Sequence, residues 1–439
     1  MNRPTTTSNG HRRVMRRRRT RLLLALATLA AAPDAAAQGC PRADAPADDP
    51  LVTVRYLASD ALEGRRAGSS GEACAADYVA GEFQRLGLVP GGEDGTFFQR
   101  VPLASAANPH APAGTGRNVV AILEGADPAL RQEVLVIGAH VDHLGRGGFG
   151  SLAPDEKDAI HNGADDNASG IAALLQIARE LARGPRPARS LVFVAFTGEE
   201  LGLLGSAYYA AHPVAPLERT RAMLNLDMVG RLGSKPVLIY GTGTALEWGE
   251  IVGRAAREEK IDFADKPDGF GPSDHTSFYA RDIPVLHFFT NVHEDYHRPS
   301  DDWQKIDRDG IRRIAQLVVH IARDVAARPA ALALQRGAGT PPGTGGPGYG
   351  AYLGTIPDFT PVERGVRLTG VRAGSPAAAA GIRAGDIIIR FEQRDIADLQ
   401  AFTDALRAHK PGDTVRITVL RDGAEVILDA TLGSRSAGN

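Results

Sequence analysis

Imidazole and carboxylate side chains recur near the ends of apolar runs in the middle of this 439-residue chain. Eight of the 12 histidines lie between His140 and His297, so most of the imidazoles lie in the same region as these carboxylate side chains. The residues that follow such runs, or open a predicted helix, and could bind a metal are His140, Asp142, His143, Asp165, Asp166, Glu199, Glu200, Asp227 and His297. In open parallel sheets the ligand site lies beyond the carboxyl ends of the strands, so we expect these side chains to converge there.

The types of these residues favour a catalytic metal centre. Imidazole and carboxylate ligands without thiolate suit zinc, cobalt or manganese that acts on a substrate, rather than a closed structural site. Three carboxylates and two histidines are too many for one catalytic zinc with an open position, and they match two metals that share a bridging carboxylate and a water. The adjacent Glu199 and Glu200 indicate that one binds metal while the other takes a proton from the water. The alternative is a solvated acidic cluster, which would be strongly self-repelling without cations.

The elements that must position these residues follow an α/β pattern. Apolar runs alternate with helix-like segments from about residue 50 to 328, which is typical of a sheet packed against helices. Expected strands are Asn118–Leu123, Val134–Gly138, Leu191–Phe196, Ala222–Leu226, Val237–Tyr240 and Val285–Phe288. Helical spacing of apolar residues predicts a helix at Ile171–Leu181. Asp301 or Asp302 is expected to cap a second helix that runs to Val325.

Charge is distributed unevenly along the chain. Residues 1–37 hold eight arginines and one acid, so they carry +7, and the net charge of −2 leaves −9 for the remainder. A body of that charge is a poor candidate for nucleic-acid binding, and no apolar run reaches the ~18 residues of a membrane span. A basic start, the apolar run Leu22–Ala32 and small residues at 35–37 predict a signal peptide over residues 1–37. We therefore expect export to the periplasm or the medium, with an arginine-rich tail or a transit peptide as the alternative.

The two cysteines, Cys40 and Cys74, both follow the predicted signal peptide. In an oxidising compartment they could form a disulfide between the N-terminal segment 38–49 and the domain that follows, and two free thiols are the alternative. No C-x-x-C is present, so neither a redox centre nor a thiolate zinc site is indicated.

Over residues of about 50–328 the sequence resembles the secreted di-zinc aminopeptidase family. That family includes bacterial leucyl aminopeptidase and, more distantly, glutamate carboxypeptidase II. The stretches that carry the resemblance are 56–65, Gly138–His143 (GAHVDH), Gly163–Gly170 (GADDNASG), Thr197–Gly202 (TGEELG), Asn225–Met228 (NLDM) and Tyr296–His297 (YH). The resemblance implies a mixed, mostly parallel central sheet that is flanked by helices.

The resemblance also implies a set of ligands for two zinc ions. Those ligands are Asp166 as the bridge, His140 and Asp227 on one ion, and Glu200 and His297 on the other. In the family the peptide bond after the bridging aspartate is often cis, so we expect a cis bond between Asp166 and Asn167. Four further histidines are expected to be loop or supporting residues rather than additional ligands; they are His143, His161, His275 and His293.

Two catalytic roles and three supporting roles follow from the same resemblance. Glu199 matches the general base, and Tyr296 matches a tyrosine that in some members hydrogen-bonds the developing oxyanion. Asp142 lies two residues after His140 and could accept its second N–H. Ser273 and Asp274 resemble a pair that supports the ligands from behind.

The C-terminal part predicts a separate unit. Residues 329–350 are rich in Gly and Pro and predict a linker, and residues 351–433 resemble a PDZ domain of the type attached to bacterial periplasmic proteases. The resemblance implies that backbone N–H groups of one loop hold a peptide C-terminus while the peptide adds a strand to a sheet edge. The residues of that loop are Tyr352, Leu353, Gly354 and Thr355. The alternative is that this domain only packs on the catalytic domain or shields an edge.

Together these features predict an exported exopeptidase with two zinc ions, and in the first place an aminopeptidase that acts on peptides. One alternative is a carboxypeptidase with the same metal set, and another is a glutaminyl cyclase with a single zinc. An inert metallopeptidase domain that serves a PDZ-based peptide-binding protein is the alternative outside enzymes.

Overall fold

The computed structural model describes residues 39–42, 47–104, 113–148, 150–153, 156, 158–336, 351–357, 362, 364–371, 374–397, 401–402, 405–406 and 408–433. The predicted signal peptide and residues 337–350 of the predicted linker lie outside these residues. Among the helices of the described residues, none combines the length and the apolar character that a membrane crossing requires.

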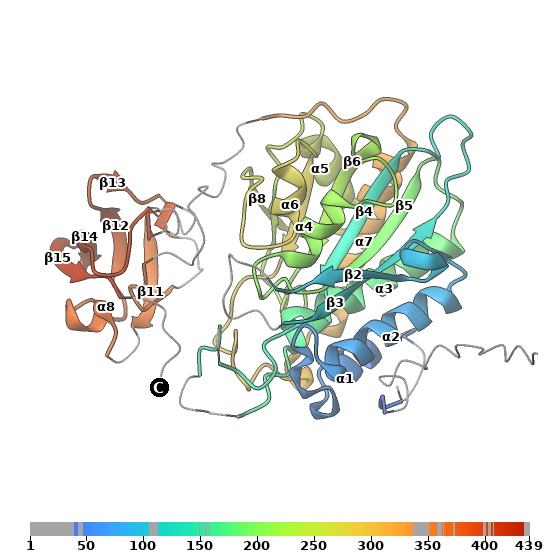
Figure 1. Ribbon diagram of the computed structural model, residues 1–439. Coiled ribbons are helices and arrows are strands. Elements are labelled where there is room, and N and C mark those ends of the chain that lie inside the picture. The colour runs from blue at the N-terminus through green and yellow to red at the C-terminus, as the bar shows by residue number, and fades with distance from the viewer. Residues whose placement is uncertain are drawn as a thin grey trace, which may run out of the picture.

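A nine-stranded mixed sheet forms the centre of the larger unit (Figure 1). Its order is β1-β3-β5-β4-β6-β9-β7-β8, and β2 also pairs with β3. The strands are β1 (Val89–Pro90), β2 (Phe98–Pro102), β3 (Thr115–Leu123), β4 (Val134–His140), β5 (Ser190–Phe196), β6 (Thr220–Leu226), β7 (Val237–Tyr240), β8 (Phe263–Lys266) and β9 (Val285–Phe289). The central strands β5, β4, β6 and β9 are parallel, whereas β3 pairs antiparallel with β5 and β7 with β9. The mixed sheet is confirmed, each expected strand is present, and the run of parallel pairs lies at the centre.

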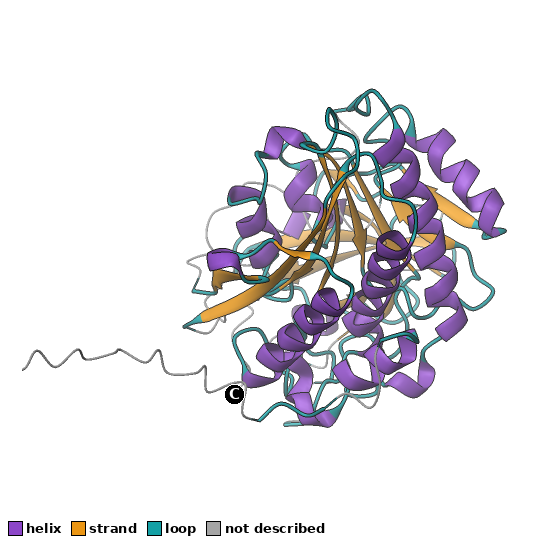
Figure 2. Ribbon diagram, turned by 90° about the vertical axis from the view of Figure 1, so that its right-hand side faces the viewer, coloured by secondary structure: helices purple, strands orange, loops and turns teal. Residues whose placement is uncertain are grey.

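Helices cover both faces of this sheet (Figure 2). On one face lie α1 (Pro50–Leu57), α2 (Ser70–Arg85), α3 (Gly170–Arg183), α5 (Trp248–Glu259) and α7 (Arg308–Ala327), and on the other lie α4 (Leu204–Ala211) and α6 (His275–Tyr279). The predicted helix at Ile171–Leu181 is therefore the middle of α3.

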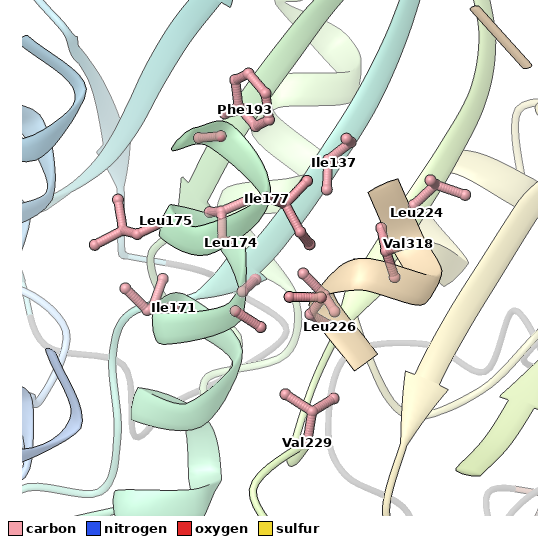
Figure 3. Packing of buried hydrophobic residues seen from close by; sticks show 14 of the residues in the cluster. Ile137, Ile171, Leu174, Leu175, Ile177, Phe193, Leu224, Leu226, Val229 and Val318 are labelled. Atoms are coloured by element: carbon pink, nitrogen blue, oxygen red, sulfur yellow. The ribbon is translucent and has the colours of Figure 1, made fainter. Parts of the chain in front are cut away.

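Alternation along β4 explains why both of its faces are buried. Ile137 belongs to the core beneath α3 and α7, whereas the preceding Val136 belongs to the core beneath α4 and α6, because successive strand side chains point to opposite faces. Figure 3 shows Leu174 of α3 and Val318 of α7 within the first of these cores. Burial of one such side chain stabilises the fold by about 1.5–3 kcal/mol, so β4 is held firmly where its end reaches the site.

The carboxyl ends of the parallel strands meet at one edge of the sheet, since β5, β4, β6 and β9 run in the same direction. An irregular turn, Ala164–Ser169, leads into α3 at this edge. The peptide bond between Asp166 and Asn167 in that turn is cis, as the resemblance implied.

A disulfide between Cys40 and Cys74 ties the segment before α1 to α2. Of the two alternatives that the sequence leaves open, the structure has the disulfide and not two free thiols. Ala47 in the same segment is fully buried. Asp49 caps α1 by accepting the N–H of Leu51 at 3.0 Å. The N-terminal segment is therefore part of the larger unit.

Residues 329–336, the first part of the predicted linker, pack on the larger unit. Leu332 is buried in its core, and the N–H of Gln335 donates to the backbone oxygen of Thr244 at 2.8 Å. Arg336 forms two hydrogen bonds of 2.8 Å to Asp282. The linker therefore does not begin at 329 as predicted, because an apolar side chain and backbone bonds fix the chain up to residue 336.

A six-stranded antiparallel sheet forms the C-terminal unit and has a core of its own. Its elements are β10 (Thr355–Pro357), β11 (Val366–Val371), α8 (Pro376–Ala379), β12 (Ile387–Phe391), β13 (Arg394–Asp395), β14 (Thr414–Arg421) and β15 (Ala424–Thr431). The alternating Val415, Ile417 and Val419 of β14 are all buried in that core. β10 lies at the end of the sheet order, so one of its edges has no neighbouring strand among the described residues.

Candidate metal centre

The five predicted ligand residues lie together at the carboxyl edge of the central sheet. His140 is the last residue of β4, and Asp227 follows β6 directly. Glu200 lies in the turn after β5, His297 in the loop after β9, and Asp166 in the turn before α3. Their side chains are between 1% and 13% exposed, so the sheet gathers them from distant parts of the chain into one buried cluster.

The two carboxylate oxygens of Asp166 face two different histidines. Oδ1 lies 3.3 Å from Nε2 of His140, and Oδ2 lies 3.1 Å from Nε2 of His297. Nε2 of His140 is also 3.3 Å from Oδ1 of Asp227, and Nε2 of His297 is 3.3 Å from Oε2 of Glu200. The atoms form two groups that share Asp166, an arrangement in which one carboxylate can bridge two metals.

The hydrogen bonds of both histidines leave one ring nitrogen for a metal. Nδ1 of His140 lies 3.1 Å from the backbone oxygen of Asp142, and Nδ1 of His297 lies 2.9 Å from that of Gly150. A carbonyl oxygen only accepts, so Nδ1 carries a proton and Nε2 is the ring nitrogen that faces the carboxylates. Imidazole Nε2 atoms and carboxylates that face one another fit divalent cations with nitrogen and oxygen ligands, such as zinc, which would take the place of the proton on each Nε2.

Asp142 contacts His140 through its backbone rather than through its carboxylate as predicted. Nδ1 of His140 is 3.8 Å from Oδ1 of Asp142, which is too long for a hydrogen bond. β4 ends at His140, so the alternation of an extended chain no longer holds two residues further on. The carboxylate instead accepts the backbone N–H of Glu199 at 3.1 Å. Burial raises the pKa of Asp142 to about 8.

His143, which is expected to be a loop or supporting residue, lies within the cluster. Its Nδ1 lies 2.8 Å from Oε1 of Glu200 and 3.8 Å from Oδ2 of Asp166. His143, Asp166 and Glu200 each place one potential ligand atom within 4.8 Å of the other two. A signal was present, because His143 directly follows Asp142 in the stretch GAHVDH at the end of β4.

Neighbouring charges separate the pKa values of the two adjacent glutamates. Burial raises the pKa of Glu199 well above its usual value, and the charges of Glu200 and Asp227 raise it further. Burial acts in the same direction on Glu200, but the charge of His297 and the hydrogen bonds from His143 and His297 together outweigh it, and the pKa falls to about 2. Glu199 therefore binds a proton much more readily than Glu200 does, which suits a group that accepts and returns one.

Of the two residues expected to support the ligands, Ser273 forms a hydrogen bond to a ligand candidate, whereas Asp274 interacts with His140 and Asp227 through charge. Oγ of Ser273 donates to Oδ2 of Asp227 at 2.8 Å and accepts from Nδ2 of Asn225 at 2.8 Å. Asp274 directly precedes α6, and burial raises its pKa to about 7 against the charge of His140. Ser273 thus orients Asp227, while Asp274 acts on the cluster through its field.

Tyr296 lies against the ligand next to it in sequence. Its ring stacks on that of His297 with 3.9 Å between the centroids. Burial raises the pKa of Tyr296 well above its usual value, and the charges of Asp166 and Glu200 raise it further. The hydroxyl is therefore within reach of the field of the carboxylates and stays protonated, so it can serve as a hydrogen-bond donor.

The other three histidines that are expected to be loop or supporting residues have partners outside the two groups of ligand atoms. Nε2 of His161 lies 2.8 Å from Oγ of Ser151. Nε2 of His293 lies 3.1 Å from Oδ2 of Asp165. His275 has its ring stacked on a neighbouring imidazole at 4.5 Å between centroids.

The predicted helix cap at Asp301 or Asp302 is wrong. α7 begins at Arg308, and its cap is Asp307, whose Oδ1 accepts the N–H of Gly310 at 2.9 Å. A short 3₁₀ turn, Trp303–Lys305, separates the predicted cap from the helix. Asp301 is fully buried and has other partners.

In the C-terminal unit, the loop Tyr352–Thr355 lies between the last strand and α8. Backbone groups of Tyr352 and Gly433 exchange hydrogen bonds of 2.7 and 2.8 Å. Gly354 has a φ of +84°, and a Cβ there would lie 2.2 Å from Cβ of Ser375. Only glycine fits that position, so the loop runs close to the start of α8 and then enters β10.

Comparison with known families matches both parts of the chain. The profile of peptidase family M28 matches residues 118–322, and that of the PDZ domain matches residues 352–432. The five ligand candidates, Glu199 and Tyr296 all lie within the first range.

Curated relatives agree with this assignment. Leupeptin-inactivating enzyme 1 of Streptomyces exfoliatus is 29% identical over 284 residues, which are 63% of this chain and 56% of that protein. Aminopeptidase YwaD of Bacillus subtilis is 33% identical over 166 residues, 36% of each. The uncharacterized protein YfbL of Escherichia coli is 31% identical over 243 residues, 48% of this chain and 69% of that one. The chain belongs to peptidase family M28 and carries a PDZ domain in addition. It spans little more than half of the first relative and about a third of the second.

Solved structures show the same fold at low sequence identity. The zinc aminopeptidase BSAP of Bacillus subtilis matches with a TM-score of 0.51 at 19% identity, covering 66% of this chain and 98% of that one. The glutaminyl cyclase of Porphyromonas gingivalis matches with a TM-score of 0.52 at 21% identity, covering 63% and 98%. Because the same fold serves an aminopeptidase and a cyclase, the fold alone does not select the reaction.

Proposed function

We propose that this chain is an exported zinc exopeptidase that removes N-terminal residues from peptides. The observation that carries the proposal is Asp166, whose two oxygens face His140 and His297 at 3.3 and 3.1 Å. A shared carboxylate of this kind favours two metals over one. The aminopeptidase name of a relative supports peptides as substrates.

The contacts among the ligand side chains indicate which residues would hold each ion. One ion would be held by His140 and Asp227 and the other by Glu200 and His297, with Asp166 shared between them. Two zinc ions held there would supply Lewis-acid polarisation of the peptide carbonyl and a water of lowered pKa. The N–H of His143 donates to Glu200 and Ser273 donates to Asp227, so both outer carboxylates are oriented from behind.

Glu199 is the general base of the proposed reaction. It takes the proton of the attacking water and passes it to the leaving amine. A hydrogen bond from the backbone N–H of Glu199 to the carboxylate of Asp142 holds Glu199 in place after the end of β5. The hydroxyl of Tyr296 donates a hydrogen bond to the oxyanion that develops on the carbonyl oxygen.

A peptide-library digest tests this proposal. The protein is incubated with peptides of mixed sequence, with and without a chelator, and products are read by mass spectrometry. We expect N-terminal trimming that the chelator abolishes and about two zinc ions per chain. C-terminal trimming would instead identify a carboxypeptidase. Cyclised N-terminal glutamine with about one zinc ion would identify a glutaminyl cyclase. No product after zinc addition would leave an inert domain.

The PDZ domain is proposed to bind peptide C-termini. β10 follows the loop Tyr352–Thr355 and lies at the edge of its sheet, which is where a peptide could add a strand. Fluorescent peptides with a free carboxylate should bind, and the same peptides with an amidated C-terminus should not. Equal binding of both forms would contradict carboxylate recognition.

Export is proposed from the basic and apolar start of the chain, and the disulfide between Cys40 and Cys74 supports an oxidising compartment. N-terminal sequencing of the protein from cell fractions tests it. We expect a mature protein outside the cytoplasm that begins near Gln38. A full-length chain in the cytoplasm would contradict export.

A further inference from the structure

Asp301 is a buried carboxylate with no role in the proposed reaction. Its Oδ2 accepts the backbone N–H groups of Asp165 at 2.8 Å and of Asp166 at 3.1 Å. Its backbone oxygen accepts the N–H of Ala164 at 3.0 Å. Three successive N–H groups of the turn that carries Asp166 therefore converge on one residue, and the exposed fraction of that residue is 0%.

The turn is shaped so that these N–H groups point toward Asp301. It begins at Gly163, whose φ is +56°, and a Cβ there would lie 2.1 Å from the backbone oxygen of Asp166. Glycine is thus required at the entrance of the turn, both by its φ and by the space. The path of the backbone is fixed on one side by Gly163 and on the other by the carboxylate of Asp301.

The charge of Asp301 is matched by Arg231. Nη2 of Arg231 donates to Oδ1 of Asp301 at 3.1 Å and lies 3.2 Å from Oδ2 of Asp295. Asp301 therefore has three donors for its two oxygens, one of them a cation. A fully buried carboxylate destabilises the fold unless it is paired and hydrogen-bonded in this way. The contacts of Asp301 therefore compensate the cost of burying its charge.

We propose that Asp301 is a positioning residue that sets the place of the bridging carboxylate relative to His297. Asp301 lies four residues after His297 in the same loop, and its carboxylate accepts a hydrogen bond from the backbone N–H of Asp166. It thereby fixes the two chain segments between which Asp166 Oδ2 and His297 Nε2 face each other at 3.1 Å. This inference rests on the proposed two-metal function.

The test substitutes Asp301→Asn, with Asp302→Asn as the matched control. The asparagine has the same size and its oxygen can still accept from the turn, but its NH₂ group then faces the guanidinium of Arg231, donor against donor. Asp302 is the next residue, is partly exposed, and accepts from Nδ2 of Asn162 at 3.2 Å. The same chemical change is thus made one position away, outside the contact with the turn.

Zinc affinity of the metal-free proteins is the measurement. Zinc is titrated against a chromophoric chelator, and unfolding of the metal-free forms is followed in parallel. We expect Asp301→Asn to weaken zinc binding by about 10–100-fold, as loss of groups that orient ligands does. Asp302→Asn should stay within about twofold, as other substitutions outside the core do. Excess zinc should restore kcat of Asp301→Asn with an unchanged KM, which a merely structural defect would not allow.

Equal zinc affinity of the two variants would overturn the inference, and so would a loss of kcat that excess zinc does not restore. If Asp301→Asn does not fold, Asp301→Glu replaces it. The glutamate keeps the charge opposite Arg231 but adds one methylene, so it displaces the turn and should weaken zinc binding in the same way. Wild-type affinity in that variant would also overturn the inference. A wild-type protein that binds no zinc would refute the two-metal function itself, which keeps the two failures distinct.

Discussion

Substitution of Glu199 by glutamine separates proton transfer from metal binding. The amide has nearly the size of the carboxylate. The substitution also leaves the hydrogen bond from the backbone N–H of residue 199 to the carboxylate of Asp142 unchanged. Glutamine cannot take a proton from water at neutral pH, so the base is removed while the metal ligands stay. The adjacent Glu200→Gln makes the same change of charge and volume in a residue that contacts Nε2 of His297 at 3.3 Å.

The two substitutions should affect different properties, kcat for Glu199→Gln and zinc affinity for Glu200→Gln. General acid–base catalysis contributes about 10²–10⁴-fold to a rate, and about 10³-fold corresponds to roughly 4 kcal/mol of barrier. We expect Glu199→Gln to lose about 10³-fold in kcat with its metal retained, because no hydrogen bond to a ligand changes. Glu200→Gln loses a ligand itself, so its zinc affinity should fall by at least about 100-fold, the upper range for groups that only support ligands.

The assay combines kcat on an aminoacyl reporter with zinc content by elemental mass spectrometry after dialysis. Excess zinc should raise the activity of Glu200→Gln and leave that of Glu199→Gln unchanged. Equal residual activity with full zinc content in both variants would refute the division of roles. A zinc-depleted Glu199→Gln would show that Glu199 is itself a ligand.

Three further outcomes are expected. Replacing Cys40 and Cys74 by serine should lower the free energy of unfolding by up to about 4 kcal/mol for a crosslink across 34 residues, and reductant should then no longer change the unfolding midpoint. The hydrogen bond from Arg221 holds the pKa of Glu133 at about 2, so this pair stabilises the fold above pH 4.5 and loses its contribution as the pH falls toward 2. Glu133→Gln should cost about 1 kcal/mol at pH 7, because the pair is partly exposed, and the difference from wild type should vanish near pH 2 in acid unfolding curves. Tyr296→Phe should lower kcat by about 10²-fold with little change in KM, and an unchanged kcat would remove the hydroxyl from the reaction.

The sequence predicted those parts of the centre that depend on strand ends. Four of the five ligand candidates lie at the end of β4 or after β5, β6 and β9, and a run of apolar residues marks the end of a buried strand clearly. The parallel order of those strands then brings the candidates together, whatever the loops do. The resemblance supplied the fifth position, Asp166, because the turn Ala164–Ser169 has no hydrophobic periodicity from which its shape could be read.

The contacts behind the ligands could not be predicted, because they depend on backbone direction after the strands end. At Asp142 the carbonyl faces His140 and the carboxylate faces Glu199, the reverse of what alternation suggests. The expected cap at Asp301 failed for a related reason. An acid before a helix looks the same in sequence whether its oxygens accept from that helix or from a turn 135 residues earlier.

Arg65 connects the chain segments around the metal centre. Among the described residues, no carboxylate lies within salt-bridge distance of its guanidinium. Arg65 is fully buried and donates to the backbone oxygens of Val141 at 3.0 Å, Asn162 at 2.7 Å and Gly163 at 3.0 Å. Burial lowers its pKa to about 10, against the charges of Asp166 and nearby acids, so it stays protonated at neutral pH. Its donors join the chain just after His140 to the chain just before Asp166. A fixed positive charge there offsets part of the repulsion among the carboxylates, so the ligand segments are held together by the protein itself and not by the metals alone.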